Sequence, residues 1–279
     1  MARRYALKKK SSPKKTKAPA RAEKKKASGK QPDLLEVARA SRGKTRETQS
    51  SKEYGAQHIE VLEGLEPVRR RPGMYIGGTD EKAMHHLFAE VIDNAMDEAV
   101  AGHATFIEVE MEANGFVTVT DNGRGIPVEA HPKFKKKSAL EVIMTTLHAG
   151  GKFNHEVYET SGGLHGVGVS VANALSETLE VEVARNSELW RQVYKRGAPT
   201  GPVKLVQKNV KRRGTRVRFK PDPEIFGKEA AFQPGRVFRM SRAKAYLFGG
   251  VEIRWRCAGE LIEAGSNVPA EAVLRFPGG

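Results

Sequence analysis

Apolar residues along the chain recur at two spacings, and these spacings predict the order of its helices and strands. The clearest helix is predicted over Met84–Val100, where apolar residues three and four positions apart form a wide face. The helical spacing also occurs in four shorter segments: His58–Val68, Ser138–Leu147, His165–Leu175 and Arg236–Phe248. The Arg71-Pro72-Gly73-Met74 stretch is expected to break the first of these.

Alternation of apolar and polar residues predicts strands, most of them in the second half of the chain. The predicted strands are Thr105–Ala113, Phe116–Thr120, Glu177–Ala184, Leu189–Tyr194, Val203–Gln207, Thr215–Lys220 and Val251–Arg256. Asn114-Gly115 predicts a tight hairpin turn between the first two. Because helices gather early and strands follow, the predicted fold class is α+β.

The positive charge of the chain is concentrated at its N-terminus. Residues 1–52 contain 18 of the 48 Lys and Arg residues and 4 of the 33 Asp and Glu residues, which is +14 of the net +15. We therefore expect a disordered basic tail over residues 1–52 and one folded domain over residues 53–279. The tail could bind DNA phosphates without sequence preference, or it could be a solubilising extension with no specific partner.

Composition excludes several classes of protein. The single cysteine, Cys257, excludes an internal disulfide framework and a zinc site that needs several thiolates. No long apolar run predicts a membrane span, and the basic N-terminus lacks the apolar core of a secretory signal. We expect a cytoplasmic protein that does not interact with membranes.

One face of the predicted Met84–Val100 helix carries a row of acidic and polar side chains. His86, Glu90, Asn94 and Asp97 share this face because they are spaced by four, four and three residues. No Lys or Arg occurs between residues 83 and 103, whereas an ordinary solvated face mixes charges of both signs. The row is either such a solvated face or a site where Mg²⁺ supplies the positive charge.

A polar turn follows the strand that ends at Thr120. Asp121 stands at the strand end, and Gly123 and Gly125 flank Arg124, so that the backbone can approach a ligand closely. A second hairpin at Asn122-Gly123 is the alternative, but no alternating strand follows, and the chain continues into a His-Pro-Lys loop. The Asp121 carboxylate could accept a hydrogen bond from an amino group such as adenine N6.

The glycine-rich stretch at residues 149–168 has the composition of a phosphate-binding segment. It contains Gly150-Gly151-Lys152 and the run from Ser161 to Gly168, and backbone amides next to a helix start can surround phosphates. It matches neither a Walker A loop nor a dinucleotide-binding fingerprint. A flexible linker is the alternative, although a linker does not usually lead into a patterned helix.

These three elements, in this order, resemble the GHKL (Bergerat-fold) ATPases. The matching segments are Glu90-Val-Ile-Asp-Asn94, Asp121-Asn-Gly-Arg-Gly125, Gly162–Gly168 and Gly214-Thr215. Longer segments resemble the B subunits of bacterial gyrase and topoisomerase IV: Arg69–Gly77, Leu147–Phe153 and Ser161–Ser170. Segments 65–71 and 244–253 are more similar to the ParE type of topoisomerase IV than to gyrase B.

The resemblance implies a two-layer sandwich, a mixed and mostly antiparallel sheet with helices on one face, that binds ATP and Mg²⁺. Glu90 would be the general base, His86 would support it, Asn94 would ligate Mg²⁺, and Asp121 would bind adenine. The implied ATP-binding residues are Tyr54, Asn94, Asp97, Asp121, Arg124, Gly125, Ile126, Pro127, Lys152, Gly163, Leu164, His165, Gly166, Val167, Gly168 and Thr215. Arg191 would lie at the pocket rim, where coumarin-type inhibitors bind. The alternatives are that Arg191 is only a strand-surface residue and that His86 is a buried core histidine.

By the same resemblance, ATP binding would close two copies into a clamp, with the Tyr54 arm reaching the partner's nucleotide. The implied partners are DNA and a ParC-type A subunit in an A2B2 heterotetramer. We expect the chain to be a piece that ends near the ATPase domain boundary and hydrolyses ATP slowly. Other possibilities are a non-enzymatic DNA-binding protein, which the charge distribution disfavours, and a histidine kinase or mismatch-repair ATPase. A kinase would need an acceptor histidine ahead of the domain, but none precedes His58.

Overall fold

The computed structural model describes residues 58, 61–149 and 167–278. Glu60–Gly279 forms one compact unit. The predicted tail and its boundary at residue 52 lie outside the described residues, as does most of the glycine-rich stretch.

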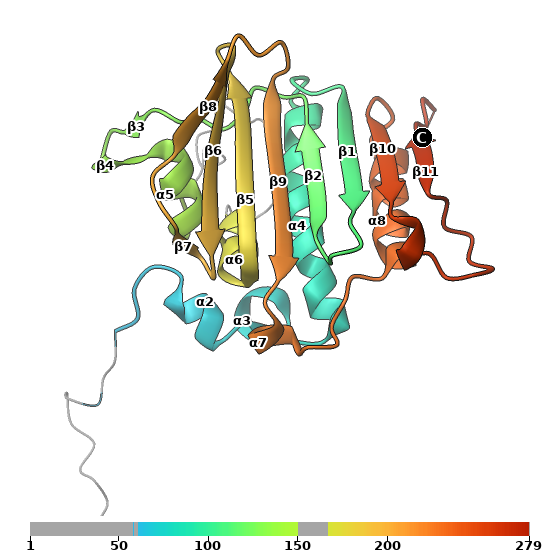
Figure 1. Ribbon diagram of the computed structural model, residues 1–279, viewed down its shortest axis with the longest axis horizontal. Helices are drawn as coiled ribbons and strands as arrows, with labels where there is room; N and C mark the ends of the chain where they lie inside the picture. Colours follow the sequence, from blue (N-terminus) through green and yellow to red (C-terminus); the bar gives the residue numbers. More distant parts are fainter. Residues whose placement is uncertain (1–57, 59–60, 150–166, 279) are drawn as a thin grey trace, which may run out of the picture. The chain divides into compact units, whose positions relative to one another are not determined.

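The centre of this unit is a nine-stranded sheet (Figure 1). Its strand order is β11-β10-β1-β2-β9-β5-β6-β7, with β8 pairing on β6. The strands are β1 Phe106–Met111, β2 Val117–Asp121, β5 Ser176–Arg185, β6 Glu188–Lys195, β7 Ala198–Pro199, β8 Lys204–Lys208, β9 Gly214–Pro221, β10 Glu252–Cys257 and β11 Glu271–Leu274. All neighbours in the described sheet are antiparallel except β1 and β10.

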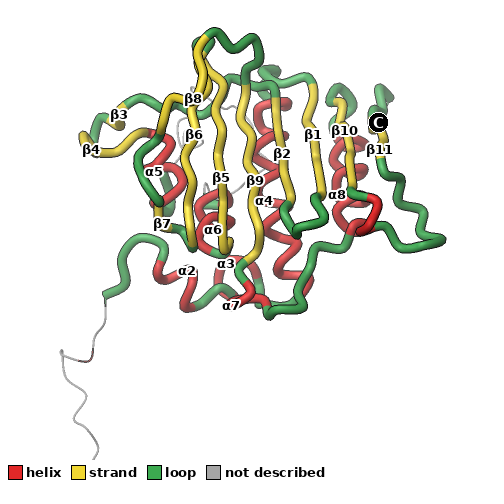
Figure 2. Tube along the Cα trace, viewed as in Figure 1, coloured by secondary structure: helices red, strands yellow, loops and turns green. Residues whose placement is uncertain are grey.

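Helices cover one face of this sheet, and the other face has no helix over it among the described residues (Figure 2). The helices are α2 Glu66–Arg70, α3 Gly73–Ile76, α4 Glu81–Val100, α5 Ala139–Thr145, α6 Gly168–Ala174, α7 Pro223–Phe226 and α8 Pro234–Leu247, with a short 3-10 helix at Gly259–Leu261. A separate two-stranded hairpin, β3 Ala130–His131 and β4 Phe134–Ser138, precedes α5. This arrangement confirms the predicted fold class.

The hydrophobic core lies between α4 and the sheet. The apolar face of α4 is fully buried at Leu87, Phe88 and Ile92, and it packs on β2, β1 and β9, where alternate residues such as Ile107 and Val109 are buried. Each such side chain contributes about 1.5–3 kcal/mol when it leaves water, so the stripe fixes which face of α4 points inward. Asp80 caps α4 by accepting a hydrogen bond from Ala83 N at 2.8 Å.

The prediction of a helix over His58–Val68 is wrong for most of the described residues in this range. α2 begins only at Glu66, because Gly64 adopts a left-handed conformation with φ 60° and Pro67 stands in the first turn of the helix. Val61 is 78% exposed, so the three-residue apolar spacing does not form one buried stripe. α2 continues to Arg70, and after the break at Arg71 the short helix α3 follows instead of a loop.

Several short elements were not predicted. The residues after Val128, expected as a loop, contain the β3–β4 hairpin, and β7, β11, α3 and α7 also lack a prediction. Each spans two to five residues, too few for a periodic pattern to develop. Of the helix predicted over His165–Leu175, the described part begins at Gly168 and ends at Ala174.

Candidate active site

Four segments that are far apart in sequence converge on the helix side of the sheet. They are the polar face of α4, the turn after β2, the start of β9 and the start of α6. A β-carbon at Gly168 would lie 1.8 Å from Glu90 Oε2, and one at Gly123 would lie 2.7 Å from Glu98 Oε2. The start of α6 and the turn after β2 therefore both contact α4.

Asp121 lies at the centre of this arrangement and is 6% exposed. Its Oδ1 accepts hydrogen bonds from Gly123 N at 2.8 Å and from Thr215 N at 3.3 Å. Burial raises the pKa of this carboxyl group to about 7, against the effect of the two hydrogen bonds, and the nearby charge of Glu98 raises it further. Asp121 therefore gains or loses a proton near neutral pH, and its ionised form can accept a hydrogen bond from a ligand.

Glycine is required where β9 begins beside Asp121. Gly214 has φ 114°, and a β-carbon there would come within 2.0 Å of the main-chain oxygen of Asp121. This close approach places Thr215 so that its amide reaches Asp121 while its Oγ1 accepts a hydrogen bond from Ile126 N at 3.3 Å. Gly214 thus joins the β2 turn to β9.

The turn after β2 is also held from its other side. Gly125 has φ 78°, and a β-carbon there would lie 3.1 Å from Ala184 O on β5. Arg185 Nη1 donates a hydrogen bond to Gly125 O at 3.0 Å. Pro127 follows on the exposed side of the turn. β2 continues in the main sheet with β1 and β9, so the alternative of a second hairpin at Asn122-Gly123 is wrong.

Some acids of α4 have cationic partners from distant segments, which corrects the expectation of an uncompensated row. Glu98 accepts hydrogen bonds from Arg124 Nη2 at 2.7 Å and from the Arg124 backbone amide at 2.9 Å. Asp93 pairs with Lys244 of α8. Residues 83–103 contain no Lys or Arg, but the fold brings these two cations in from elsewhere.

Glu90 and Asn94 lie one turn apart on the half-buried polar face of α4. Asn94 Nδ2 donates to Glu90 O at 2.8 Å, so the amide nitrogen faces the helix backbone and the oxygen faces away. Asp97, on the same face, is 1% exposed. An amide oxygen and a carboxylate are thus placed side by side near the start of α6. Tyr54, Lys152, Gly163, Leu164, His165 and Gly166 lie outside the described residues.

Residues 79–225 match the family described as "Histidine kinase-, DNA gyrase B-, and HSP90-like ATPase". The chain belongs to this ATPase family. The match covers more than half of the chain and contains α4, the β2 turn, the start of α6 and Thr215.

Relatives within this ATPase family are close in sequence. The chain is 62% identical over 227 residues to the B subunit of DNA topoisomerase 4 from Caulobacter vibrioides. The aligned region covers 81% of this chain and 32% of the relative. It is 54% identical over 202 residues to the B subunit of DNA gyrase from Thermotoga maritima, covering 72% and 31% of the two chains. The chain thus spans about a third of the length of these relatives.

A solved structure in this ATPase family has the same fold. The 43K ATPase domain of Thermus thermophilus gyrase B, in complex with an aminocoumarin, matches with a TM-score of 0.66 and 44% identity. The match covers 77% of this chain and 52% of that chain.

In the described part of this chain, no helix has the length and apolarity needed to cross a membrane.

The two adjacent histidines of α4 occupy different environments. His86, one turn before Glu90, is exposed, so the alternative that it is a buried core histidine is wrong. His85 is the buried one, and burial lowers the pKa of its imidazole. Its Nε2 accepts a hydrogen bond from Gln233 N at 3.0 Å, so its Nδ1 donates to Glu81 O at 2.7 Å. The support of Glu90 by His86 stays a prediction.

Arg191 lies on β6 with its side chain on the outer face of the sheet. It alternates with the buried, helix-facing Gln192 and pairs with Glu180 of β5. These contacts are those of a strand-surface residue, and the role at the pocket rim stays a prediction that they do not support.

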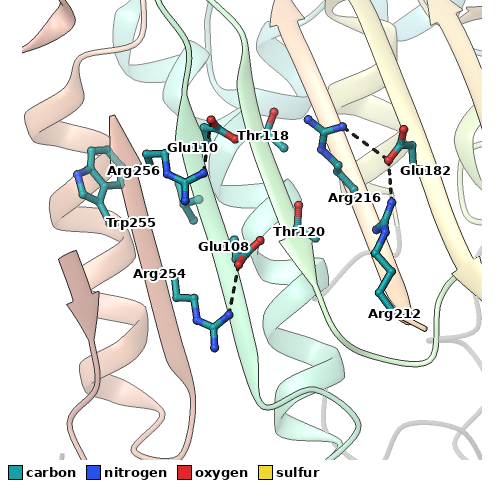
Figure 3. Close-up of a pocket in the computed structure, with 11 residues that line it drawn as sticks. Glu108, Glu110, Thr118, Thr120, Glu182, Arg212, Arg216, Arg254, Trp255 and Arg256 are labelled. Atoms are coloured by element: carbon teal, nitrogen blue, oxygen red, sulfur yellow. Dashed lines mark hydrogen bonds and ion pairs between the residues drawn. The ribbon is translucent and has the colours of Figure 1, made fainter. Parts of the chain in front are cut away.

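Glu98 was not among the predicted site residues, although it holds Arg124 and contacts Gly123. Its sequence signal was its spacing, because it follows Asn94 by four residues on the same helix face. A separate hollow of about 340 Å³ lies on the outer face, lined by β1, β2, β5, β9 and β10 (Figure 3). It is on the opposite side of the sheet from α4 and does not belong to this site.

Proposed function

We propose that residues 53–279 form a domain that binds and hydrolyses ATP with Mg²⁺. The observation that carries the proposal is the buried Asp121 carboxyl group, which Gly123 and Thr215 hold at a strand end near the polar face of α4. A buried carboxylate of this kind can accept a hydrogen bond from the adenine amino group. Asp97, Arg124, Gly125, Ile126 and Pro127 would surround the base.

At the other end of the site, Glu90 would orient the attacking water and accept its proton. His86 would support Glu90 from one turn earlier. General-base catalysis of this kind contributes roughly 10²–10⁴-fold, while positioning contributes most of the rest. Lys152 and the backbone from Gly163 to Gly168 would hold the phosphates.

The donor set near Glu90 fits a magnesium ion that is bound together with the nucleotide. Among the described residues, no three or more His, Cys, Asp or Glu side chains come together as metal ligands. Mg²⁺ usually binds through one or two protein oxygens plus substrate phosphates, and the outward amide oxygen of Asn94 suits that role. The ion would neutralise phosphate charge beside the acidic face of α4.

We further propose that the chain is the ATPase part of a topoisomerase IV B subunit of the ParE type. The relatives named as B subunits of DNA topoisomerase 4 support this, at 53–62% identity over 226–227 residues. ATP would close two copies into a clamp that drives passage of one DNA duplex through another. A ParC-type A subunit would complete an A2B2 assembly in the cytoplasm. The gyrase B type is the alternative. The gyrase relative was solved in complex with an aminocoumarin, which supports the proposal that coumarin-type inhibitors bind this chain.

The residue to test is Glu90. Glu90→Ala is expected to lower ATP turnover by at least about 100-fold, because the general base is removed. Nucleotide affinity, measured by calorimetry with and without Mg²⁺, is expected to stay within about threefold, because Glu90 acts on water rather than on the base. Glu263→Ala removes an exposed acid elsewhere and should change neither quantity. Unchanged turnover in Glu90→Ala, or no nucleotide binding by the parent chain, would refute the proposal.

A further inference from the structure

The β3–β4 hairpin carries an unusual concentration of positive charge. Residues 130–140 contain four lysines, at positions 133, 135, 136 and 137, and no Asp or Glu. By contrast, residues 53–279 as a whole have a net charge of only +1. The charge is therefore a local feature of the hairpin.

These lysines differ from most arginines of the domain in their ion pairing. Arginines on the outer face of the sheet have glutamate partners: Arg216 and Arg254 each pair with a glutamate on a neighbouring strand, and Arg218 pairs with Glu112 just after β1. In the hairpin, Lys137 pairs with Glu141 at 3.6 Å. Within the part of the chain that the structure describes, Lys133, Lys135 and Lys136 have no ion-pair partner. Three cations are thus available to an external anion.

The hairpin also exposes an aromatic side chain among these cations. Phe134 is 45% exposed and contacts the ring of His131, with the ring centroids 5.3 Å apart. Residues 134–137 of β4 are all exposed, so burial does not explain the presence of an aromatic residue here. Exposed cations interleaved with an aromatic residue are typical of surfaces that bind nucleic acid.

The hairpin is anchored at its base rather than along its length. The chain enters it beside Glu129, whose carbonyl accepts a hydrogen bond from Ala139 N at 2.8 Å. It leaves through Ser138, which caps α5 by accepting a hydrogen bond from Glu141 N at 3.0 Å. In Figure 1 the hairpin stands out beside α5 at the edge of the molecule formed by β6 and β8. An anchored, projecting hairpin presents its cations in a fixed place.

We propose that this hairpin is a contact surface for the phosphate backbone of duplex DNA. The inference rests on the proposed topoisomerase function, which makes duplex DNA the polyanion that the domain meets. Phe134 pairs with His131 and Ser138 pairs with Ala130, so Lys135, Lys136 and Lys137 lie in a bulge of β4 and are all exposed. The exposed lysines of this bulge therefore neutralise phosphates without reading base sequence.

The test compares two variants of the full 279-residue chain that lose the same charge. The hairpin variant is Lys133→Gln, Lys135→Gln and Lys136→Gln. The control variant is Lys82→Gln, Lys195→Gln and Lys228→Gln, which removes three exposed lysines dispersed over the domain. Binding to a duplex of about 30 base pairs and arbitrary sequence is measured by fluorescence anisotropy over a range of salt concentrations.

The hairpin variant is expected to bind this duplex about tenfold more weakly than the control variant. Each lost phosphate contact lowers the slope of log affinity against log salt by about 0.9, so the slope should fall by about two to three. Equal affinity and slope in the two variants would overturn the proposal and leave the lysines as a solvated surface. Unchanged DNA binding with loss of self-association would assign the hairpin to a protein contact instead, and would equally overturn it.

A proximity measurement separates the hairpin from the basic N-terminal tail. Cys257 is buried, so a photocrosslinker attached to Phe134→Cys reacts selectively at the hairpin. Crosslinks to the duplex are expected from this position and not from an equivalent Lys228→Cys probe. Nucleotide binding is measured on the same variants and should match that of the parent chain. Failure of DNA contact alone is thereby distinguished from failure of the proposed ATPase function.

Discussion

At Asp121, burial and hydrogen bonding act in opposite directions on one carboxyl group. Two backbone amides stabilise its charged form, yet desolvation outweighs them and raises the pKa to about 7. The free, folded protein therefore holds this group partly protonated at neutral pH. A ligand amino group that needs a charged acceptor must bind the ionised fraction.

Adenine binding should therefore depend on pH. As the pH rises from about 6 to about 8 through the raised pKa, the ionised fraction of Asp121 grows about tenfold, and adenosine affinity should rise by a similar factor. Adenosine is the probe because it has no phosphate that titrates in this range. Asp121→Asn should bind more weakly and lose the pH dependence. A pH-independent affinity in the parent chain would contradict the role of Asp121.

The same titration has a defined effect on stability without ligand. Because the folded pKa lies above the unfolded value, the native state binds more protons than the unfolded state between about pH 4 and pH 7. The contribution of Asp121 to the free energy of unfolding is present below that window and is lost as the pH rises through it. Denaturant unfolding of Asp121→Asn at about pH 5 and about pH 8 should show that the parent chain loses stability relative to the variant at the higher pH.

A second prediction at the scale of one residue concerns Gly168. In Gly168→Ala the new β-carbon would overlap Glu90 Oε2, so the carboxylate must rotate away. ATP turnover should fall at least about tenfold, because the general base loses its position. Stability should not fall, because alanine favours the helix that begins there. Gly201→Ala, where a β-carbon meets nothing within 4 Å, is the matched control. Equal turnover in both variants would exclude a role for this contact.

At the scale of elements, an ion-pair cluster fastens α2 to the rest of the domain. Asp222, fully buried before α7, pairs with Arg69 of α2 at 2.7 Å and with Arg196 Nε at 3.1 Å. Arg69 Nη1 also donates to Ala174 O at the end of α6, at 2.7 Å. One carboxylate thus connects α2, α7 and the turn after β6, and Arg69 extends this connection to α6.

Removing one partner of this cluster should be costly. Asp222→Ala leaves two guanidinium groups without their buried acid and is expected to lower the free energy of unfolding by about 3–5 kcal/mol. Arg70→Gln breaks the exposed pair with Glu66 on the same helix and should cost less than about 1 kcal/mol. Chemical denaturation measures both. A loss below about 1 kcal/mol in Asp222→Ala would show that the cluster adds little stability.

Long periodic elements were predictable from sequence, whereas contacts between distant segments were not. The stripe of α4 and the alternation of β5 and β9 reflect burial of one face, which the residues themselves encode. The β3–β4 hairpin buries almost nothing, so it leaves no such pattern. In the site, Asp121 followed from its place at a strand end. The partners of Glu98 and Asp93 could not be predicted from the sequence, because only tertiary packing brings Arg124 and Lys244 to α4.

At the scale of the whole molecule, we expect the basic tail to contribute to DNA binding and the folded domain to bind the nucleotide. Deleting residues 1–52 should leave nucleotide affinity within about threefold of the parent value, because all the described site residues lie in the folded domain. The deletion removes 18 basic residues and should weaken binding to duplex DNA and reduce its salt dependence. Calorimetry with nucleotide and anisotropy with DNA test the two statements separately. Loss of nucleotide binding in the shortened chain would contradict the predicted boundary at residue 52.

Charge on the outer face of the sheet bears on how the chain avoids misfolding. The acidic strands β1 and β5 are never neighbours, and neither are the arginine-bearing strands β9 and β10. If β1 paired with β5 during folding, Glu108 and Glu110 would face Glu180 and Glu182, and like charges across strands repel. The ion pairs of the native order therefore discriminate against non-native strand orders, even where each pair adds little to the stability of the finished sheet.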